Sequence, residues 1–99
     1  MTQVVLTPEA ENDLVQIWQF TAVMYGVDQA DDYLSQLAAG MRQLTEYPLL
    51  GSNYDHVLSG YRRLIIERHA IFYKTNRNEI LVIRVLHQDM DAPRTLNLI

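Results

Sequence analysis

The spacing of apolar residues changes along the chain, and this change limits the folds that the chain can adopt. In the first half, two segments repeat their apolar residues every three or four positions, as one face of a helix does. The first stripe runs from Leu14 through Ile17 to Tyr25, and the second runs from Ala30 to Leu44. From residue 61 onward, short runs rich in Ile, Val, Leu and aromatic residues are typical of strands. The sequence therefore predicts a helical half followed by a strand half.

Residues that favour helix starts and stops mark the ends of the two predicted helices. Thr7 and Pro8 predict the start of the first helix, as its N-cap and its first helical residue, and Gly26 predicts its end. Asp28 is the predicted N-cap of the second helix, and Pro48 predicts its end. Because only one or two residues link these helices, we expect an antiparallel helical hairpin.

The predicted strands surround this hairpin in the sequence. Residues 4–6 form a short apolar run, and residues 48–60 have the composition of a loop. Three further strands, expected to form an antiparallel meander, cover residues 61–66, 70–75 and 80–87. The order β-α-α-β-β-β predicts an α+β fold, with an N-terminal strand and a helical hairpin packed on a small antiparallel sheet. A chain of 99 residues is expected to form a single domain, residues 1–99.

Composition restricts the classes of protein to which the chain can belong. It has no cysteine, no run of 18 apolar residues and no signal-peptide pattern, so we expect a cytoplasmic protein that does not enter a membrane. Its net charge is −4, but residues 1–55 hold eight acids and one base, whereas residues 56–99 hold seven bases and four acids. This asymmetry suggests two faces that meet different partners. Alternatively, the helices carry acids on their solvated sides.

Four short motifs follow one another along residues 4–91. They are LTPEAENDL with IW after it, YPLLG, GYRR followed by RHAIFY, and VIRVLHQDMD; their first residues are Leu6, Tyr47, Gly60 and Val82. Together, and in this order, they resemble the ParE branch of the ParE/RelE toxin superfamily. The resemblance implies the toxin of a type II toxin–antitoxin system that inhibits DNA gyrase and is neutralised by a ParD-type antitoxin in a hetero-oligomer. It implies no cofactor, and contact with nucleic acid only through the gyrase–DNA or antitoxin–operator complex.

The predicted fold indicates where an antitoxin would bind. A groove beside a helical hairpin, together with an exposed sheet edge, suits an amphipathic helix and an added strand. Apolar residues on the hairpin and arginines on the strands are the candidates, because the arginines would pair with an acidic antitoxin arm. The antitoxin-binding candidates are Ile17, Phe20, Leu34, Leu37, Met41, Arg62, Arg63 and Arg84.

The C-terminal part of the chain is the predicted gyrase contact, since the resemblance assigns toxicity to this region. The candidates are His87, Met90, Asp91 and Arg94. The alternative for His87 is a structural role, in which it caps the last strand and bonds the following loop. The acids Asp28 and Asp31 stand at a helix start without metal-ligand spacing, so we expect no metal site.

Two alternative functions compete with gyrase inhibition. RelE-like toxins are ribosome-dependent mRNA endoribonucleases, and the strand half offers histidines and arginines for acid–base chemistry and phosphate binding. The isoelectric point near 5.1 argues against this alternative. So do Ala70 and Gln88, which stand where those nucleases hold basic residues. We therefore expect no catalytic residues. The other alternative is a non-toxic chain that binds its antitoxin and acts as a co-repressor.

Overall fold

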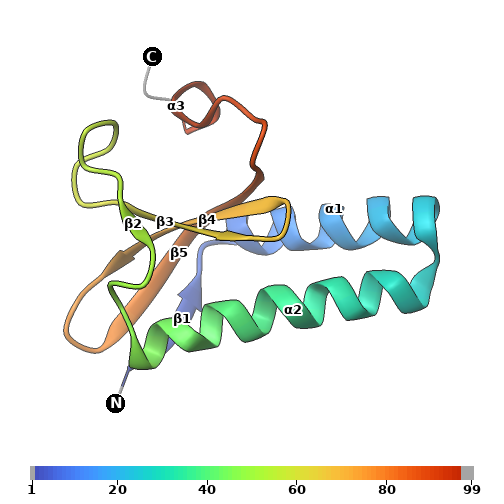
Figure 1. Cartoon of the computed structure of the whole chain (residues 1–99), viewed down its shortest axis with the longest axis horizontal. Coiled ribbons are helices and arrows are strands. Elements are labelled where there is room, and N and C mark those ends of the chain that lie inside the picture. The colour runs from blue at the N-terminus through green and yellow to red at the C-terminus, as the bar shows by residue number, and fades with distance from the viewer. Residues whose placement is uncertain (1, 97–99) are drawn as a thin grey trace.

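The computed structural model describes residues 2–96 and is shown in Figure 1. It has the predicted α+β fold, in which a strand and two helices precede the other strands. The elements are β1 (Gln3–Leu6), α1 (Pro8–Tyr25), α2 (Val27–Glu46), β2 (Ser52–Asn53), β3 (Arg62–Ile66), β4 (His69–Thr75), β5 (Glu79–His87) and α3 (Ala92–Thr95).

The helical hairpin depends on the residues at its ends. Thr7 caps α1, because its hydroxyl oxygen accepts the N–H of Ala10 at 3.0 Å, and Gly26 ends α1 with a φ of 98° that favours glycine. The prediction that Asp28 caps α2 is wrong: α2 begins at Val27, and no side chain caps it. Gly26 flanks both helices, and a single linking residue leaves no position for a separate cap.

The sheet is mixed rather than fully antiparallel. β3, β4 and β5 form the predicted antiparallel meander, and the order across the sheet is β1-β5-β4-β3-β2. β1 lies at the edge of the sheet, but it pairs parallel with β5, whereas the predicted sheet was antiparallel. Apolar patterning indicates a strand, but it does not specify which strand will be its neighbour or in which direction that neighbour runs. The two-residue β2, within the predicted loop, is an additional strand paired with β3.

The sheet is covered on both faces. Figure 1 shows α1 and α2 on one side, and α3 with the loop after β2 on the other. The helix-side core contains Ala10, Leu37, Met41, Leu44, Ile71, Tyr73, Ile80, Val82 and Val85. The core on the other side contains Tyr54, Leu58, Ala70, Phe72, Leu86 and Ala92. Burial of β4 and β5 on both faces explains why these strands are almost continuously apolar in the sequence.

A close approach between α2 and β3 explains an otherwise unfavourable glycine. A Cβ on Gly40 would lie 2.0 Å from Cδ1 of Ile66, so a larger side chain would have to displace the Ile66 side chain from its place between α2 and β3. Glycine inside a helix costs about 1 kcal/mol relative to alanine. The close helix–sheet packing at Gly40 offsets this cost.

The far half of the helical hairpin extends beyond the strands, as Figure 1 shows. Five large apolar side chains near this end are more than half exposed: Phe20, Val23, Met24, Tyr25 and Val27. Neither helix, within the part of the chain that the structure describes, is long and apolar enough to cross a membrane. Clustered apolar surface of this kind marks an interaction site.

Candidate partner-binding cleft

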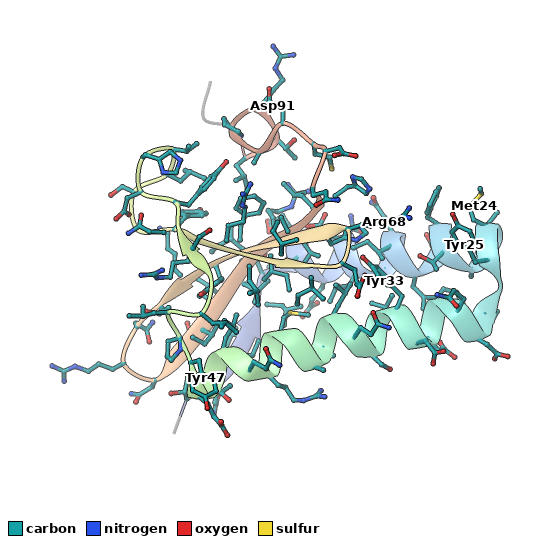
Figure 2. All side chains as sticks on the ribbon, viewed as in Figure 1. Met24, Tyr25, Tyr33, Tyr47, Arg68 and Asp91 are labelled. Atoms are coloured by element: carbon teal, nitrogen blue, oxygen red, sulfur yellow. The ribbon has the colours of Figure 1, made fainter. Side chains whose placement is uncertain are left out.

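A cleft of about 870 Å³ opens between the helical hairpin and the end of the sheet where β4 begins and β5 ends. One wall is formed by α1 and α2, and the opposite side by the β3–β4 turn, β5 and the loop that follows β5. Figure 2 shows Tyr33 of α2 and Arg68 of the turn close together, with Tyr25 farther along the hairpin. Helices and strands thus line the cleft together, and we call it the partner cleft.

The hairpin wall of the partner cleft combines large apolar side chains with polar ones. Ile17, Phe20 and Tyr25 line it from α1, and the side chains of Phe20 and Tyr25 are each 64% exposed. The helical repeat brings these residues to one side of α1, because positions three, four or eight apart share a face. Large exposed aromatic groups beside polar groups are typical of protein-binding surfaces.

Two histidines and a tyrosine form the polar centre of the partner cleft. His69 and His87 are register partners on β4 and β5, and their ring centroids lie 5.4 Å apart with an interplanar angle of 80°. The hydroxyl of Tyr33 lies 2.6 Å from Nδ1 of His69. The same hydroxyl oxygen accepts the backbone N–H of Arg68 at 3.3 Å. One tyrosine on α2 therefore fixes both the β3–β4 turn and the orientation of the His69 ring.

Burial shifts the pKa values of His69 and Tyr33. The pKa of His69 is lowered from its usual 6.5, first by burial and then by the neighbouring His87, whereas Asp13 acts in the opposite direction. Burial also raises the pKa of the Tyr33 hydroxyl above 10. His69 is therefore neutral at neutral pH, and Tyr33 keeps its proton for hydrogen bonding.

An ion pair closes the inner end of the partner cleft. Asp13 of α1 accepts hydrogen bonds from Nε and Nη2 of Arg84 at 2.8 and 2.9 Å, and from the backbone N–H of Val85 at 2.9 Å. The hydrogen bond to Asp13 is the main cause of the raised pKa of Arg84. Arg84, a predicted antitoxin-binding residue, lines the cleft, but its guanidinium is already paired within the protein.

The other predicted antitoxin contacts on the hairpin divide between cleft and core. Ile17 and Phe20 line the partner cleft, whereas Leu34 is partly buried against the helix-side core. Leu37 and Met41 are only 0% and 5% exposed, so they offer no surface to a partner in this structure. Apolar spacing identifies the buried stripe of a helix, but the same pattern does not show which part of that stripe the sheet covers.

Arg62 and Arg63 lie on β3, away from the partner cleft. Nη1 of Arg62 donates to the backbone carbonyl of Gly51 at 2.7 Å. The Arg63 guanidinium stacks on the Tyr54 ring at 5.4 Å, and its buried Nε has no hydrogen-bond partner among the described residues. These two arginines hold the β2 segment and the loop that follows it, and they do not share a surface with Ile17 and Phe20.

The predicted gyrase contact is also divided. His87 and Met90 line the partner cleft. Asp91 and Arg94 belong to the start and body of α3, where Oδ1 of Asp91 accepts the backbone N–H of Arg94 at 3.3 Å. The structural alternative for His87 has support as well, because Nδ1 of His87 accepts the N–H of Asp89 at 3.2 Å.

Among the cleft residues that were not predicted from the sequence, Asp13 and Tyr33 make side-chain hydrogen bonds to the strand half. Asp13 was not predicted as a site residue, although its place beside Leu14 and Ile17 puts it on the sheet-facing side of α1. The Tyr33 hydroxyl pairs with Nδ1 of His69, a contact between residues 36 positions apart that sequence spacing does not indicate. No group of three acids or histidines in residues 2–96 is arranged to hold a metal ion.

Known proteins share both the sequence and the fold. A family model described as "ParE toxin of type II toxin-antitoxin system, parDE" matches residues 4–92. Toxin ParE1 of Mycobacterium tuberculosis is 40% identical over 92 residues, which cover 92% of this chain and 94% of that protein. Toxin ParE1 of Caulobacter vibrioides is 37% identical over 87 residues, which cover 88% of this chain and 90% of that protein. A solved structure titled "Chromosomal ParDE TA system from P. aeruginosa" superposes with a TM-score of 0.77 at 20% identity, covering 88% of this chain and 96% of that one.

The structural similarity identifies the class of fold, the α+β fold of that ParDE structure. The sequence matches identify the family: this chain belongs to the ParE toxins of type II toxin–antitoxin systems. The predicted resemblance and fold class are thereby confirmed.

Proposed function

We propose that this ParE-family chain inhibits DNA gyrase, and that a ParD-type antitoxin neutralises it in the cytoplasm by filling the partner cleft. The supporting observation is that residues from both predicted surfaces line one cleft. Ile17 and Phe20 belong to the predicted antitoxin surface, and His87 and Met90 belong to the predicted gyrase contact. A segment bound there covers all four, so antitoxin and gyrase compete for the same surface.

The chemistry of the partner cleft suits an amphipathic helix of the antitoxin. The apolar face of such a helix would contact Phe20 and Tyr25, which are largely exposed in the free chain. Its polar side would face Arg68 and the histidine pair across the cleft. Burial of two exposed aromatic side chains gives the toxin–antitoxin hetero-oligomer its main stabilisation.

Gyrase inhibition is tested with purified protein. The chain is titrated into a supercoiling reaction on relaxed plasmid, and cleaved DNA is trapped and quantified. We expect inhibition with accumulated cleaved DNA, and a loss of at least about tenfold in potency for Met90→Glu, since a charge at an interface centre disrupts apolar contact. Leu50→Glu is the matched control, because Leu50 and Met90 are both 47% exposed and Leu50 lies outside the cleft. Unimpaired supercoiling in the presence of the folded chain refutes the gyrase target.

Antitoxin binding is tested on the helical wall. We expect Phe20→Glu to weaken the affinity for a ParD-type antitoxin by roughly 10- to 100-fold, the effect of losing a buried aromatic anchor. Val15→Glu is the control on the same helix, since Val15 is 53% exposed, lies outside the apolar cluster at the end of the hairpin and does not line the cleft. Equal affinities of the two variants would place the antitoxin elsewhere.

A ribonuclease is the second candidate, because one observation favours it. His69, His87 and Arg68 line a single cleft, and this combination supplies an acid, a base and a cation. Against it, the cation of Arg84 is held by Asp13. Ribosome-dependent cleavage of a transcript, abolished by His69→Gln, would establish this function. Growth arrest on induction excludes the non-toxic co-repressor alternative.

A further inference from the structure

In the histidine pair of the partner cleft, neighbouring groups determine which ring nitrogens accept hydrogen bonds and which donate them. His69 and His87 face each other across β4 and β5, and both line the cleft. The Tyr33 hydroxyl oxygen accepts the N–H of Arg68, so its own proton is available to donate to Nδ1 of His69. Nδ1 of His87 accepts the N–H of Asp89. With Tyr33 as the donor to His69, both rings use Nδ1 as an acceptor.

The role of Nδ1 as an acceptor determines the protonation of Nε2 in each ring. A neutral imidazole that accepts at Nδ1 carries its proton on Nε2, which makes Nε2–H a donor. Neither His69 nor His87 has a hydrogen-bond partner at Nε2 within residues 2–96, and Nε2 of neither ring is buried without a partner. Two adjacent strands thus present two N–H donors at the base of one cleft.

Charged groups of both signs surround the pair. Arg68, the neighbour of His69 in the chain, lines the cleft, and Arg84 lies on β5 with its charge paired to Asp13. Glu67 also lines the cleft from the turn, and Asp89 lies 3.6 Å from Nδ1 of His87. The Asp13 carboxylate is paired with Arg84, and the Asp89 carboxylate lies on the Nδ1 side of the His87 ring, which leaves Nε2–H of both rings and the Arg68 side chain for a ligand.

We propose that His69 and His87 form a carboxylate-binding site, occupied by an acidic side chain of the antitoxin segment in the partner cleft, and that antitoxin affinity is therefore coupled to proton uptake. This inference rests on the proposed antitoxin binding. A carboxylate placed against two imidazole N–H groups favours the charged imidazolium form. The paired rings and Arg68 then bind one carboxylate with three donors.

The direction of the pH effect follows from linkage. In the free chain, burial and the neighbouring ring keep His69 neutral near pH 7. A bound carboxylate stabilises the protonated rings, so the complex binds more protons than the separate partners do. The affinity therefore rises as pH falls. We expect the antitoxin to bind roughly tenfold more tightly at about pH 6 than at about pH 8, a change that one coupled proton accounts for.

The experiment follows the three histidines of the wild-type chain by NMR, free and bound to a ParD-type antitoxin, and calorimetry in two buffers measures proton uptake. We expect His69 and His87 to stay protonated to higher pH in the complex. His56 is the internal control, because it is exposed in the loop between β2 and β3 and does not line the cleft. His87→Gln should remove much of the pH dependence of affinity, and His56→Gln should leave it unchanged.

The outcomes separate this inference from the proposed function. Tight antitoxin binding with no proton uptake, and with His69 and His87 titrating as in the free chain, overturns the carboxylate site and leaves the toxin–antitoxin function intact. Equal pH dependence in His87→Gln and His56→Gln also overturns it. Absence of antitoxin binding at every pH refutes the proposed function and the site together.

Discussion

Replacing Asp13 by alanine removes the carboxylate that joins α1 to β5. Asp13 is 8% exposed and accepts three hydrogen bonds, two from Arg84 and one from the backbone N–H of Val85. Removing one member of a buried ion pair costs about 3–5 kcal/mol, because the remaining charge loses its partner. The Arg84 side chain is 24% exposed and regains some hydration, which reduces this cost. The Val85 N–H adds about 1 kcal/mol if it stays buried without an acceptor. We expect a net loss of about 2–4 kcal/mol.

Urea denaturation, monitored by circular dichroism, measures this loss as a change in the free energy of unfolding. For a chain of this length, about 2–4 kcal/mol corresponds to a melting temperature lower by roughly 10–20 °C. Glu11→Ala is the matched control, since Glu11 is an exposed acid on the same helix and takes no part in the Asp13–Arg84 ion pair. Asp13→Ala combined with Arg84→Met isolates the coupling between the two residues. A loss no larger than that of Glu11→Ala would refute the structural role of this pair.

Three further predictions concern packing, a buried hydroxyl and pH. Gly40→Leu should cost about 1–3 kcal/mol in urea denaturation through overpacking against β3, whereas the exposed neighbour Ala39→Leu should change stability by less than about 0.5 kcal/mol. Tyr73→Phe should cost about 1–3 kcal/mol by the same measurement, because the Tyr73 hydroxyl accepts the N–H of Gly51 and donates to a loop carbonyl. The pKa of His69 in the folded chain lies below 6.5, so the unfolded chain binds a proton at this histidine at a higher pH than the folded chain does. The free energy of unfolding should therefore fall as pH drops below about 6.5, and it should level off below the folded pKa. His69→Gln should flatten that segment of the stability–pH profile.

The arrangement of the partner cleft suggests how toxin and antitoxin activities are linked. His87 and Met90 lie in the same cleft as Phe20, so one bound segment reaches all three. Neutralisation by direct coverage then needs no conformational change in the toxin. Competition between antitoxin and gyrase for binding to this chain is the observation that would support such a mechanism.

Local sequence signals determined the secondary structure. Thr7 and Pro8 start α1, and Gly26 ends it, because caps and left-handed glycines depend on neighbouring backbone groups alone. The three apolar runs after residue 60 became β3, β4 and β5, since period-two and continuous apolar patterns reflect burial of a strand's own faces. These features, with the four family motifs, were sufficient for the fold class and the family.

Contacts between distant segments were decided only by the tertiary structure. The parallel pairing of β1 with β5, the Asp13–Arg84 ion pair and the meeting of Tyr33, His69 and His87 all join residues far apart in the chain. Several of these residues were predicted site residues. However, His87 and Phe20 were predicted to bind different partners, and Leu37 was predicted to lie on the antitoxin-binding surface. Periodicity shows which side of an element is apolar, whereas the sheet's position on that side decides which residues are core and which line a cleft.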